Sequence, residues 1–172
     1  MKLTALLAAA SLIQAAPAAA QRPCLSDPEA ESLTLVVLPD VIRETGRLCQ
    51  ARLGRNSLLR GANGPLIARY QAAADRAWPA ARQAIVKLSD PAVTMLLQSE
   101  YARPVLSSLI APQVVGRITV EDCSLIDRLV TLLEPLPPAN TAGVVVTAIR
   151  ADQERRGERE RSGQDLPLCP AK

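Results

Sequence analysis

Helical patterns of apolar and polar residues recur along this chain, whereas strand patterns do not. The widest apolar stripe falls within residues 119–133, where apolar residues recur every three to four positions. Its members are Leu125, Ile126, Leu129, Val130, Leu132 and Leu133. A stripe this wide is typical of a helix deep in a bundle, so we expect residues 119–133 to form a buried helix.

Helix starts are marked by polar residues that can cap the first backbone N–H groups. Glu29 follows Ser26 by three residues and can complete a capping box with it, while Pro28 suits a first helical turn. Further caps precede apolar runs at Ser89 or Asp90, Thr119 and Asn140. These signals predict helices that begin near each of these positions.

Prolines subdivide the helical pattern, because proline lacks an N–H and its ring clashes with the preceding turn. We expect Pro39 to separate two helices, Pro79 to kink or split the helix that begins at Leu66, and Pro104 to restart a helix after residue 102. Residues 112–118 suit a short strand and a short helix equally. The sequence therefore predicts an all-α, compact bundle of about six or seven short, proline-punctuated helices. The predicted helices cover residues 28–38, 39–53, 66–88, 91–102, 104–109 and 119–133, with one more from residue 140.

The first twenty residues resemble a bacterial secretion signal. Lys2 provides a positive start, residues 3–16 are apolar, and residues 17–20 end in the small-residue pattern of a cleavage site. We predict a cleavable signal peptide over residues 1–20 and a single helical domain over residues 21–172. No later run reaches ~18 consecutive apolar residues, so we expect no transmembrane segment after cleavage and a periplasmic or secreted protein.

The four cysteines are even in number and contain no Cys-x-x-Cys pair, which favours two disulfides in an oxidising compartment. A zinc site made of four scattered cysteines is the alternative. Four cysteines allow three pairings. If a straight helix covered residues 28–48, Cys24 and Cys49 would lie ~30 Å apart. A chain that folds back at Pro39 would remove this obstacle, and we therefore predict the pairs Cys24–Cys49 and Cys123–Cys169.

The chain contains no histidine, which excludes catalytic triads with a histidine base and histidine metal sites. It also lacks a phosphate-binding loop, a dinucleotide-binding turn and a calcium loop. Carboxylates remain as candidates for general acid–base catalysis. The acidic residues near residue 121 and those near residue 100 could line one cleft. The residues concerned are Glu121, Asp122, Asp127, Glu100 and Tyr101. Helix capping and surface exposure explain them more simply, so we assign no catalytic residue, no metal and no cofactor.

Positive charge is concentrated in the middle of the chain, where residues 43–82 carry eight arginines against two acidic residues. Arg52, Arg55 and Arg60 surround a glycine-rich loop, where an anionic envelope component or an acidic envelope protein could reach them. Solvated surface charge is the simpler explanation. Nucleic acid is disfavoured, because the chain is predicted to be exported and only three residues are aromatic: Tyr70, Trp78 and Tyr101. Residues 152–172 are expected to form a charged, partly flexible C-terminal tail.

These observations favour a non-catalytic, exported cell-envelope protein that acts as a helical binding module. Such a protein should expose an apolar or arginine-lined patch. A small-ligand or lipid carrier is the alternative, and it would enclose an aliphatic cavity between helices. A carboxylate-dependent hydrolase ranks last, because it needs acidic groups that converge in a cleft with a raised pKa.

Overall fold

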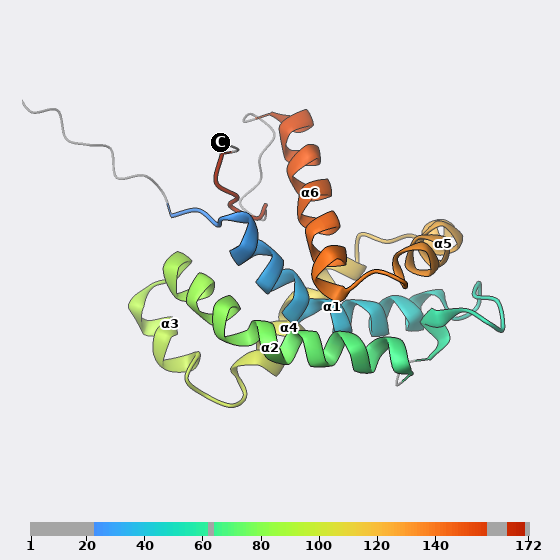
Figure 1. Cartoon of the computed structure of the whole chain (residues 1–172), viewed down its shortest axis with the longest axis horizontal. Coiled ribbons are helices and arrows are strands. Elements are labelled where there is room, and N and C mark those ends of the chain that lie inside the picture. The colour runs from blue at the N-terminus through green and yellow to red at the C-terminus, as the bar shows by residue number, and fades with distance from the viewer. Residues whose placement is uncertain (1–22, 62–63, 158–164, 171–172) are drawn as a thin grey trace, which may run out of the picture.

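The computed structural model describes residues 23–61, 64–157 and 165–170, and most of these residues lie in helices (Figure 1). They contain six α-helices, two 3₁₀ turns and no strand, with one isolated backbone pairing between Leu25 and Leu168. The predicted all-α class is therefore confirmed. The elements in chain order are α1 (Asp27–Cys49), η1 (Leu58–Arg60), α2 (Pro65–Leu88), α3 (Pro91–Leu96), α4 (Ala102–Val115), η2 (Val120–Asp122), α5 (Cys123–Leu133) and α6 (Pro138–Arg156).

Two of the predicted helix starts follow from capping hydrogen bonds. The backbone N–H and the hydroxyl of Ser26 both donate to Glu29 Oε2 at 2.8 Å, which forms the expected link at the start of α1. The backbone N–H of Thr119 donates to Asp122 Oδ2 at 2.9 Å at the start of η2. The prediction for Asn140 was wrong, because α6 already begins at Pro138.

α1 is the central helix, and it packs against α2, α4 and α6 (Figure 1). The predicted break at Pro39 is wrong, since α1 runs unbroken from Asp27 to Cys49. Pro39 cannot donate a hydrogen bond to the carbonyl group four residues earlier. However, its ring is among the most fully buried side chains, and this packing offsets the lost bond. Tertiary burial therefore overrides the local tendency of proline to end a helix.

The two other prolines that were predicted to divide helices, Pro79 and Pro104, also lie within helices. α2 continues through Pro79 without being split, and α4 already begins before Pro104. Residues 112–115 form the last turn of α4, where the backbone N–H of Gly116 donates to the Pro112 carbonyl at 2.8 Å. The open alternative for residues 112–118 is therefore resolved as a helix end followed by a turn.

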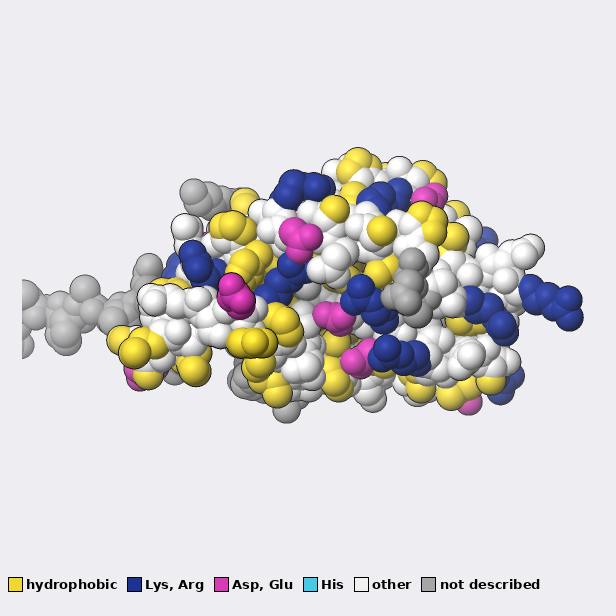
Figure 2. All heavy atoms as spheres, turned by 90° about the horizontal axis from the view of Figure 1, so that it is seen from below, with side chains coloured by type: hydrophobic (Ala, Val, Ile, Leu, Met, Phe, Trp, Pro, Cys, Tyr) yellow, Lys and Arg dark blue, Asp and Glu magenta, His cyan; other side chains and the backbone are white. Residues whose placement is uncertain are grey.

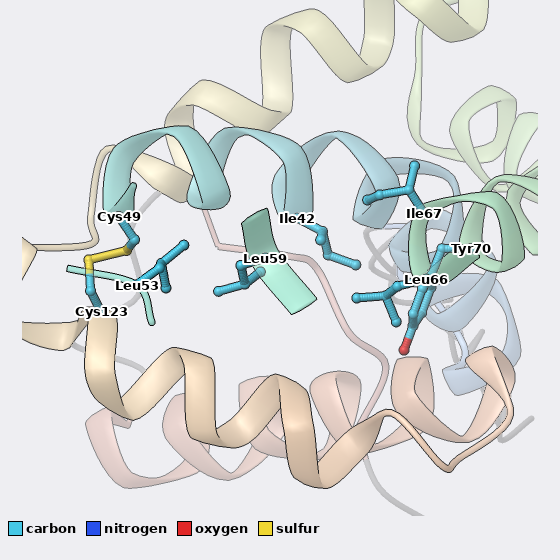
Figure 3. Close-up of a cluster of buried hydrophobic side chains, with 8 residues drawn as sticks. All are labelled: Ile42, Cys49, Leu53, Leu59, Leu66, Ile67, Tyr70 and Cys123. Atoms are coloured by element: carbon cyan, nitrogen blue, oxygen red, sulfur yellow. A yellow bond between two sulfur atoms is a disulfide. The ribbon is translucent and has the colours of Figure 1, made fainter. Parts of the chain in front are cut away.

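The buried aliphatic side chains form two clusters, one toward each end of α1. The larger cluster joins the C-terminal half of α1 to η1, α2 and the start of α5 (Figure 3). It contains Ile42, Cys49, Leu53, Leu59, Leu66, Ile67, Tyr70 and Cys123. The smaller cluster, at the N-terminal end of α1, contains Leu25, Ala30, Ala84 and Val146. The core at both ends of α1 is therefore mainly aliphatic, as expected from a chain without phenylalanine.

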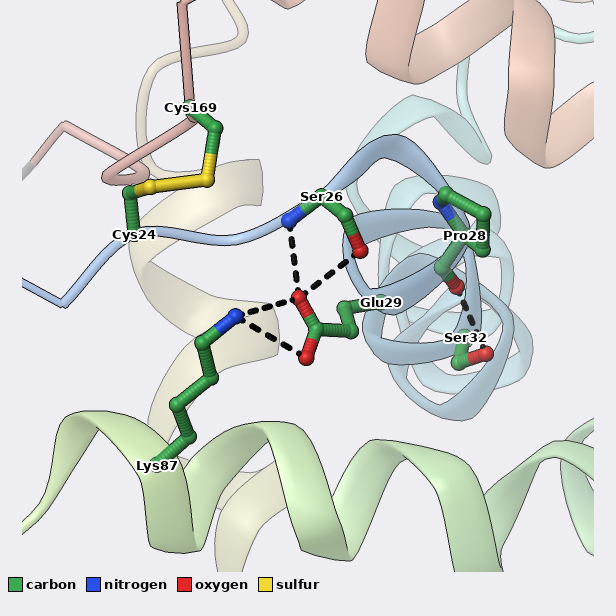
Figure 4. Close-up of polar contacts among 7 residues, drawn as sticks. All are labelled: Cys24, Ser26, Pro28, Glu29, Ser32, Lys87 and Cys169. Atoms are coloured by element: carbon green, nitrogen blue, oxygen red, sulfur yellow. Dashed lines mark hydrogen bonds and ion pairs between the residues drawn. A yellow bond between two sulfur atoms is a disulfide. The ribbon is translucent and has the colours of Figure 1, made fainter.

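Two disulfides are present, but the predicted pairing is wrong. Cys24 pairs with Cys169, and Cys49 pairs with Cys123 (Figures 3 and 4). The Cα atoms lie 4.9 Å and 5.5 Å apart. Because α1 is not broken at Pro39, it separates Cys24 from Cys49 by its whole length, and each cysteine finds a partner from a distant part of the chain. One disulfide therefore joins the two terminal segments, and the other joins α1 to α5.

The described part of the predicted C-terminal tail packs on the bundle. The Leu25 backbone N–H donates to the Pro167 carbonyl at 2.7 Å, and the Cys169 N–H donates to the Leu25 carbonyl at 2.8 Å. The side-chain amide of Gln153 donates to the Leu166 carbonyl at 2.9 Å. Residues 165–170 are thereby held beside the start of α1. Residues 158–164 and 171–172, which also belong to the predicted tail, lie outside the described residues.

Candidate functional site

α5 lies at the edge of the bundle, which corrects the prediction of a deeply buried helix. Cys123 is its only buried residue. Leu125, Leu129 and Leu132 are 58%, 46% and 64% exposed. Their spacing of four and three residues places them on one side of the helix. These three side chains, which we call the leucine face of α5, are uncovered in this structure.

The opposite side of α5 attaches the helix to the bundle. Ile126 and Val130 pack against the larger apolar cluster, and Cys123 forms the disulfide to α1. Asp127 accepts a 2.6 Å hydrogen bond from the hydroxyl of Ser57. Figure 3 shows α5 extending from Cys123 along one side of the cluster. The inner side of α5 is thus fixed, and this orientation turns the leucine face outward.

Of the three arginines predicted to contact an anionic partner, Arg60 has a structural role. Its Nε and Nη2 groups donate to the Leu53 carbonyl at 3.2 and 3.0 Å, and Nη2 also donates to the Gln50 carbonyl at 3.2 Å. Carbonyl groups at the end of a helix lack partners within the helix. The Arg60 guanidinium group provides donors for the carbonyl groups that follow α1, and it thereby stabilises the turn there. A contact between Arg60 and a partner stays a prediction.

Arg52 and Arg55 are exposed, and they lie in the segment that borders α5. The pKa of Glu121 is lowered by a hydrogen bond from its own backbone N–H, by a second one from the Thr119 side chain, and by the nearby charge of Arg52. Arg52 is therefore close to the start of α5. Arg128 is also exposed, and at 100° per residue it flanks the leucine face.

The surface differs between the two ends of the molecule. In Figure 2, Lys and Arg side chains gather toward the end where residues 50–61 lie, and hydrophobic side chains stand out at the opposite end, where α3 lies. The exposed large hydrophobic residues of α3, α4 and the turn between them are Met95, Leu96, Tyr101, Val105, Leu109 and Val114. We call them the α3–α4 apolar surface. The charged residues within residues 89–115 are Asp90, Glu100 and Arg103, so this surface lacks the excess of arginine found beside α5.

The predicted cluster of carboxylates does not assemble into a catalytic cleft. Asp122 accepts the capping bonds of Thr119, and Asp127 accepts the bond from Ser57. Tyr101 is 75% exposed. Each carboxyl group whose pKa is shifted has that pKa lowered by hydrogen bonds, which favours the charged form and does not suit a general acid. These groups are Glu29, Asp75, Glu121 and Asp122.

Glu100, by contrast, lines a hollow that sequence reasoning missed. This cleft of about 450 Å³ lies where α1, α2 and α4 meet, and we call it the Trp78 cleft. Its lining consists of Asp40, Gln71, Trp78, Glu100, Arg103, Pro104 and Ser107. No local signal in the sequence brings residues 40, 78 and 100 together, because only the packing of three helices does so. A second hollow of about 670 Å³ lies along α6 and includes Glu31.

A lipid carrier is expected to have an aliphatic cavity. The Trp78 cleft is lined by the charged residues Asp40, Glu100 and Arg103, and the hollow along α6 is lined by Glu31 beside small residues. Within residues 23–61, 64–157 and 165–170, His, Cys, Asp and Glu side chains form no group of three that could hold a metal ion. None of the described helices is both long enough and apolar enough to cross a bilayer. Comparison with known proteins finds no matching family model, curated protein or solved structure.

Proposed function

We propose that this protein is an exported helical binding module that docks on an anionic lipid surface of the cell envelope through the leucine face of α5. The observation that carries the proposal is the exposure of Leu125, Leu129 and Leu132 on a helix whose opposite side is fixed. Helices that bind at a membrane surface insert an apolar side and place basic residues beside it. α5 combines both features.

The leucine face suits a deformable partner, because its three exposed side chains lie on a helix at the edge of the bundle. A leucine that inserts half of its side chain contributes roughly 1 kcal/mol. Three leucines thus contribute roughly 3 kcal/mol, or about a hundredfold in affinity.

The charges beside the leucine face favour an anionic surface over a second copy of the chain. Arg128 lies on α5, Arg52 lies close to its start, and Arg55 follows Arg52 by three residues; all three are exposed. Each basic residue near an anionic membrane adds about 1 kcal/mol. In a symmetric pair of α5 helices, the same arginines would approach one another. Three leucines also bury at most roughly 350 Å² per copy, well below the ~800 Å² per partner of a standard protein interface.

Export is supported by the two disulfides, because such bonds persist in oxidising compartments. The predicted signal peptide over residues 1–20 lies outside the described residues. We expect intact-mass analysis of protein recovered from the periplasm or the medium to give a chain that begins at Gln21. A chain that retains its first twenty residues and remains in the cytosol with reduced cysteines would contradict this part of the proposal.

Cosedimentation with vesicles tests the docking. The purified protein should bind phosphatidylglycerol vesicles and not phosphatidylcholine vesicles. Its affinity should fall when NaCl is raised from about 50 mM to about 300 mM, because salt screens the arginine charges. The triple variant Leu125→Ser, Leu129→Ser, Leu132→Ser should bind about a hundredfold more weakly. The variant Arg52→Gln, Arg55→Gln, Arg128→Gln should lose about tenfold or more and most of the salt dependence.

The α3–α4 apolar surface provides a matched control. Leu96, Val105 and Leu109 are 70%, 53% and 60% exposed, close to the values of the leucine face. The triple serine variant at these positions should bind vesicles like the unmodified protein. If this control loses binding instead, or if no variant changes vesicle binding, docking through α5 is wrong. Dimerisation abolished by the α5 variant in analytical ultracentrifugation would show that a second copy covers the face, which also contradicts the proposal.

A further inference from the structure

The Trp78 cleft contains more acceptors than free donors. Arg43 donates to Asp40 Oδ1 at 2.6 Å and to Gln71 Oε1 at 3.3 Å. Arg103 is paired with Asp75. In both pairs a guanidinium group already has a carboxylate partner, which reduces its attraction for an anionic ligand. The cleft is therefore poorly suited to an anionic ligand.

Glu100 is the lining carboxylate without such a partner. Glu100 is exposed and borders the cleft, and its side chain forms no hydrogen bond or ion pair with the residues that the structure describes. It thus adds one uncompensated negative charge to the lining. An uncompensated negative charge in a partly enclosed site attracts a cation.

Ser107 is a second polar group at the cleft. The residue is 3% exposed, it lines the cleft, and its hydroxyl has no hydrogen-bond partner within the described part of the chain. Because the hydroxyl oxygen is not among the fully buried atoms that lack a partner, it remains accessible from the cleft. The neighbouring Ser108 hydroxyl, in contrast, donates to the Val105 carbonyl at 2.8 Å. The hydroxyl of Ser107 is therefore available to a molecule in the cleft.

We propose that the Trp78 cleft binds a small organic cation with a protonated amine. The ammonium group would donate to Glu100 and Ser107, and its hydrocarbon part would lie against Trp78 and Pro104. An indole ring attracts cations through its negative face, and ammonium N–H groups satisfy carboxylate and hydroxyl oxygens. The volume of about 450 Å³ lies within the range of small-molecule sites. This site is separate from the leucine face of α5 and does not depend on docking there.

Trp78 is the only tryptophan of the chain, so its fluorescence reports on the cleft directly. We would titrate the purified protein with benzylammonium, and with neutral benzyl alcohol and anionic benzoate as ligands of similar shape. Benzylammonium should change the fluorescence saturably, with a dissociation constant of roughly 1 mM or below. The two other compounds should produce no saturable change. An equal response to benzoate, or no saturable response to benzylammonium, would overturn the proposal.

Variants of the lining separate specific binding from general attraction. Glu100→Gln should weaken binding roughly tenfold or more, because it removes the charged acceptor. Ser107→Ala should weaken it roughly threefold to tenfold. Glu154→Gln, which removes an exposed charge on α6, should bind like the unmodified protein. Far-ultraviolet circular dichroism verifies that each variant is folded. Equal affinity of the Glu100 and Glu154 variants would show that the cleft is not the binding site.

Discussion

The two ends of α1 are fixed in different ways. At the N-terminal end, the Cys24–Cys169 disulfide lies beside a polar network (Figure 4). Glu29 accepts bonds from Lys87 Nζ at 3.1 and 2.9 Å and from Ser26. Backbone bonds to residues 165–170 add further links. Several independent interactions thus hold the same segments together.

The C-terminal end of α1 relies on apolar packing and few polar links. The Cys49–Cys123 disulfide lies inside the larger cluster (Figure 3), and the Ser57–Asp127 bond joins the neighbouring segment to α5. Because α5 is held on one side only, its leucine face stays uncovered. The proposed docking face therefore lies at the end of α1 that depends more on apolar packing than on polar links. The polar end, with its repeated links, acts as the rigid support.

The largest expected effect comes from removing the disulfides one at a time. The first double variant combines Cys49→Ser with Cys123→Ser, and the second combines Cys24→Ser with Cys169→Ser. Each should lower the free energy of unfolding, measured by urea denaturation, by about 2–4 kcal/mol. Only the first double variant should also weaken vesicle binding, because it releases α5 from its fixed orientation. If the second double variant weakens vesicle binding equally, the two ends of α1 are not independent.

A glycine at each end provides a smaller test of packing. A Cβ atom at Gly46 would clash with the backbone carbonyl oxygen of Leu59, so Gly46→Ala should lower the free energy of unfolding by about 1–3 kcal/mol. A Cβ atom at Gly143 would meet only the carboxylate of Glu31 at 3.3 Å, and this flexible side chain can move. Gly143→Ala should therefore be neutral or stabilise the helix by up to about 1 kcal/mol. The melting temperatures of both variants measure these effects. If Gly46→Ala melts at a higher temperature than Gly143→Ala, α1 does not approach η1 as closely as the structure indicates.

The smallest expected effect concerns the polar end and its dependence on pH. The hydrogen bond from Lys87, with smaller contributions from those of Ser26, lowers the pKa of Glu29 from its ordinary 4.5 to about 2. Since the pKa is lower in the folded protein, this stabilisation is present above pH 4.5 and is lost as the pH falls toward 2. Lys87→Met should raise the pKa of Glu29 toward 4.5 in an NMR titration. It should change the free energy of unfolding by at most about 1 kcal/mol, because the pair is partly exposed.

Arg82→Met is the matched control for that titration, because it removes an exposed cation from the same helix. It should leave the pKa of Glu29 unchanged. Should both variants shift this pKa equally, general charge and not the specific bond to Lys87 would be its cause.

Short-range signals predicted much of the fold. The links of Ser26 to Glu29 and of Thr119 to Asp122 span three residues, so the sequence contains both partners within one turn. The exposure of Leu125, by contrast, could not be predicted. A helical apolar stripe shows which side of a helix avoids water, but not whether the chain provides enough neighbours to cover it.

The candidate sites were predictable only in part. Arg52 and Arg55 are exposed, as a loop rich in arginine suggests. Arg60, by contrast, donates to the Gln50 and Leu53 carbonyl groups in the turn that follows α1, and only the fold positions these groups. The Trp78 cleft was missed because Trp78 and Glu100 carry no motif. Only the approach of α4 to α1 and α2 makes them neighbours.

By itself the sequence determined the helical class, the capped starts of α1 and η2, the aliphatic core and the absence of histidine chemistry. These depend on residue type and on contacts within a few residues. The tertiary structure decided the continuity of α1 through Pro39, the pairing of the cysteines, the uncovered face of α5 and the lining of the Trp78 cleft. Each of these depends on which distant segments pack together, because burial and cross-links between remote residues outweigh local preferences when the two conflict.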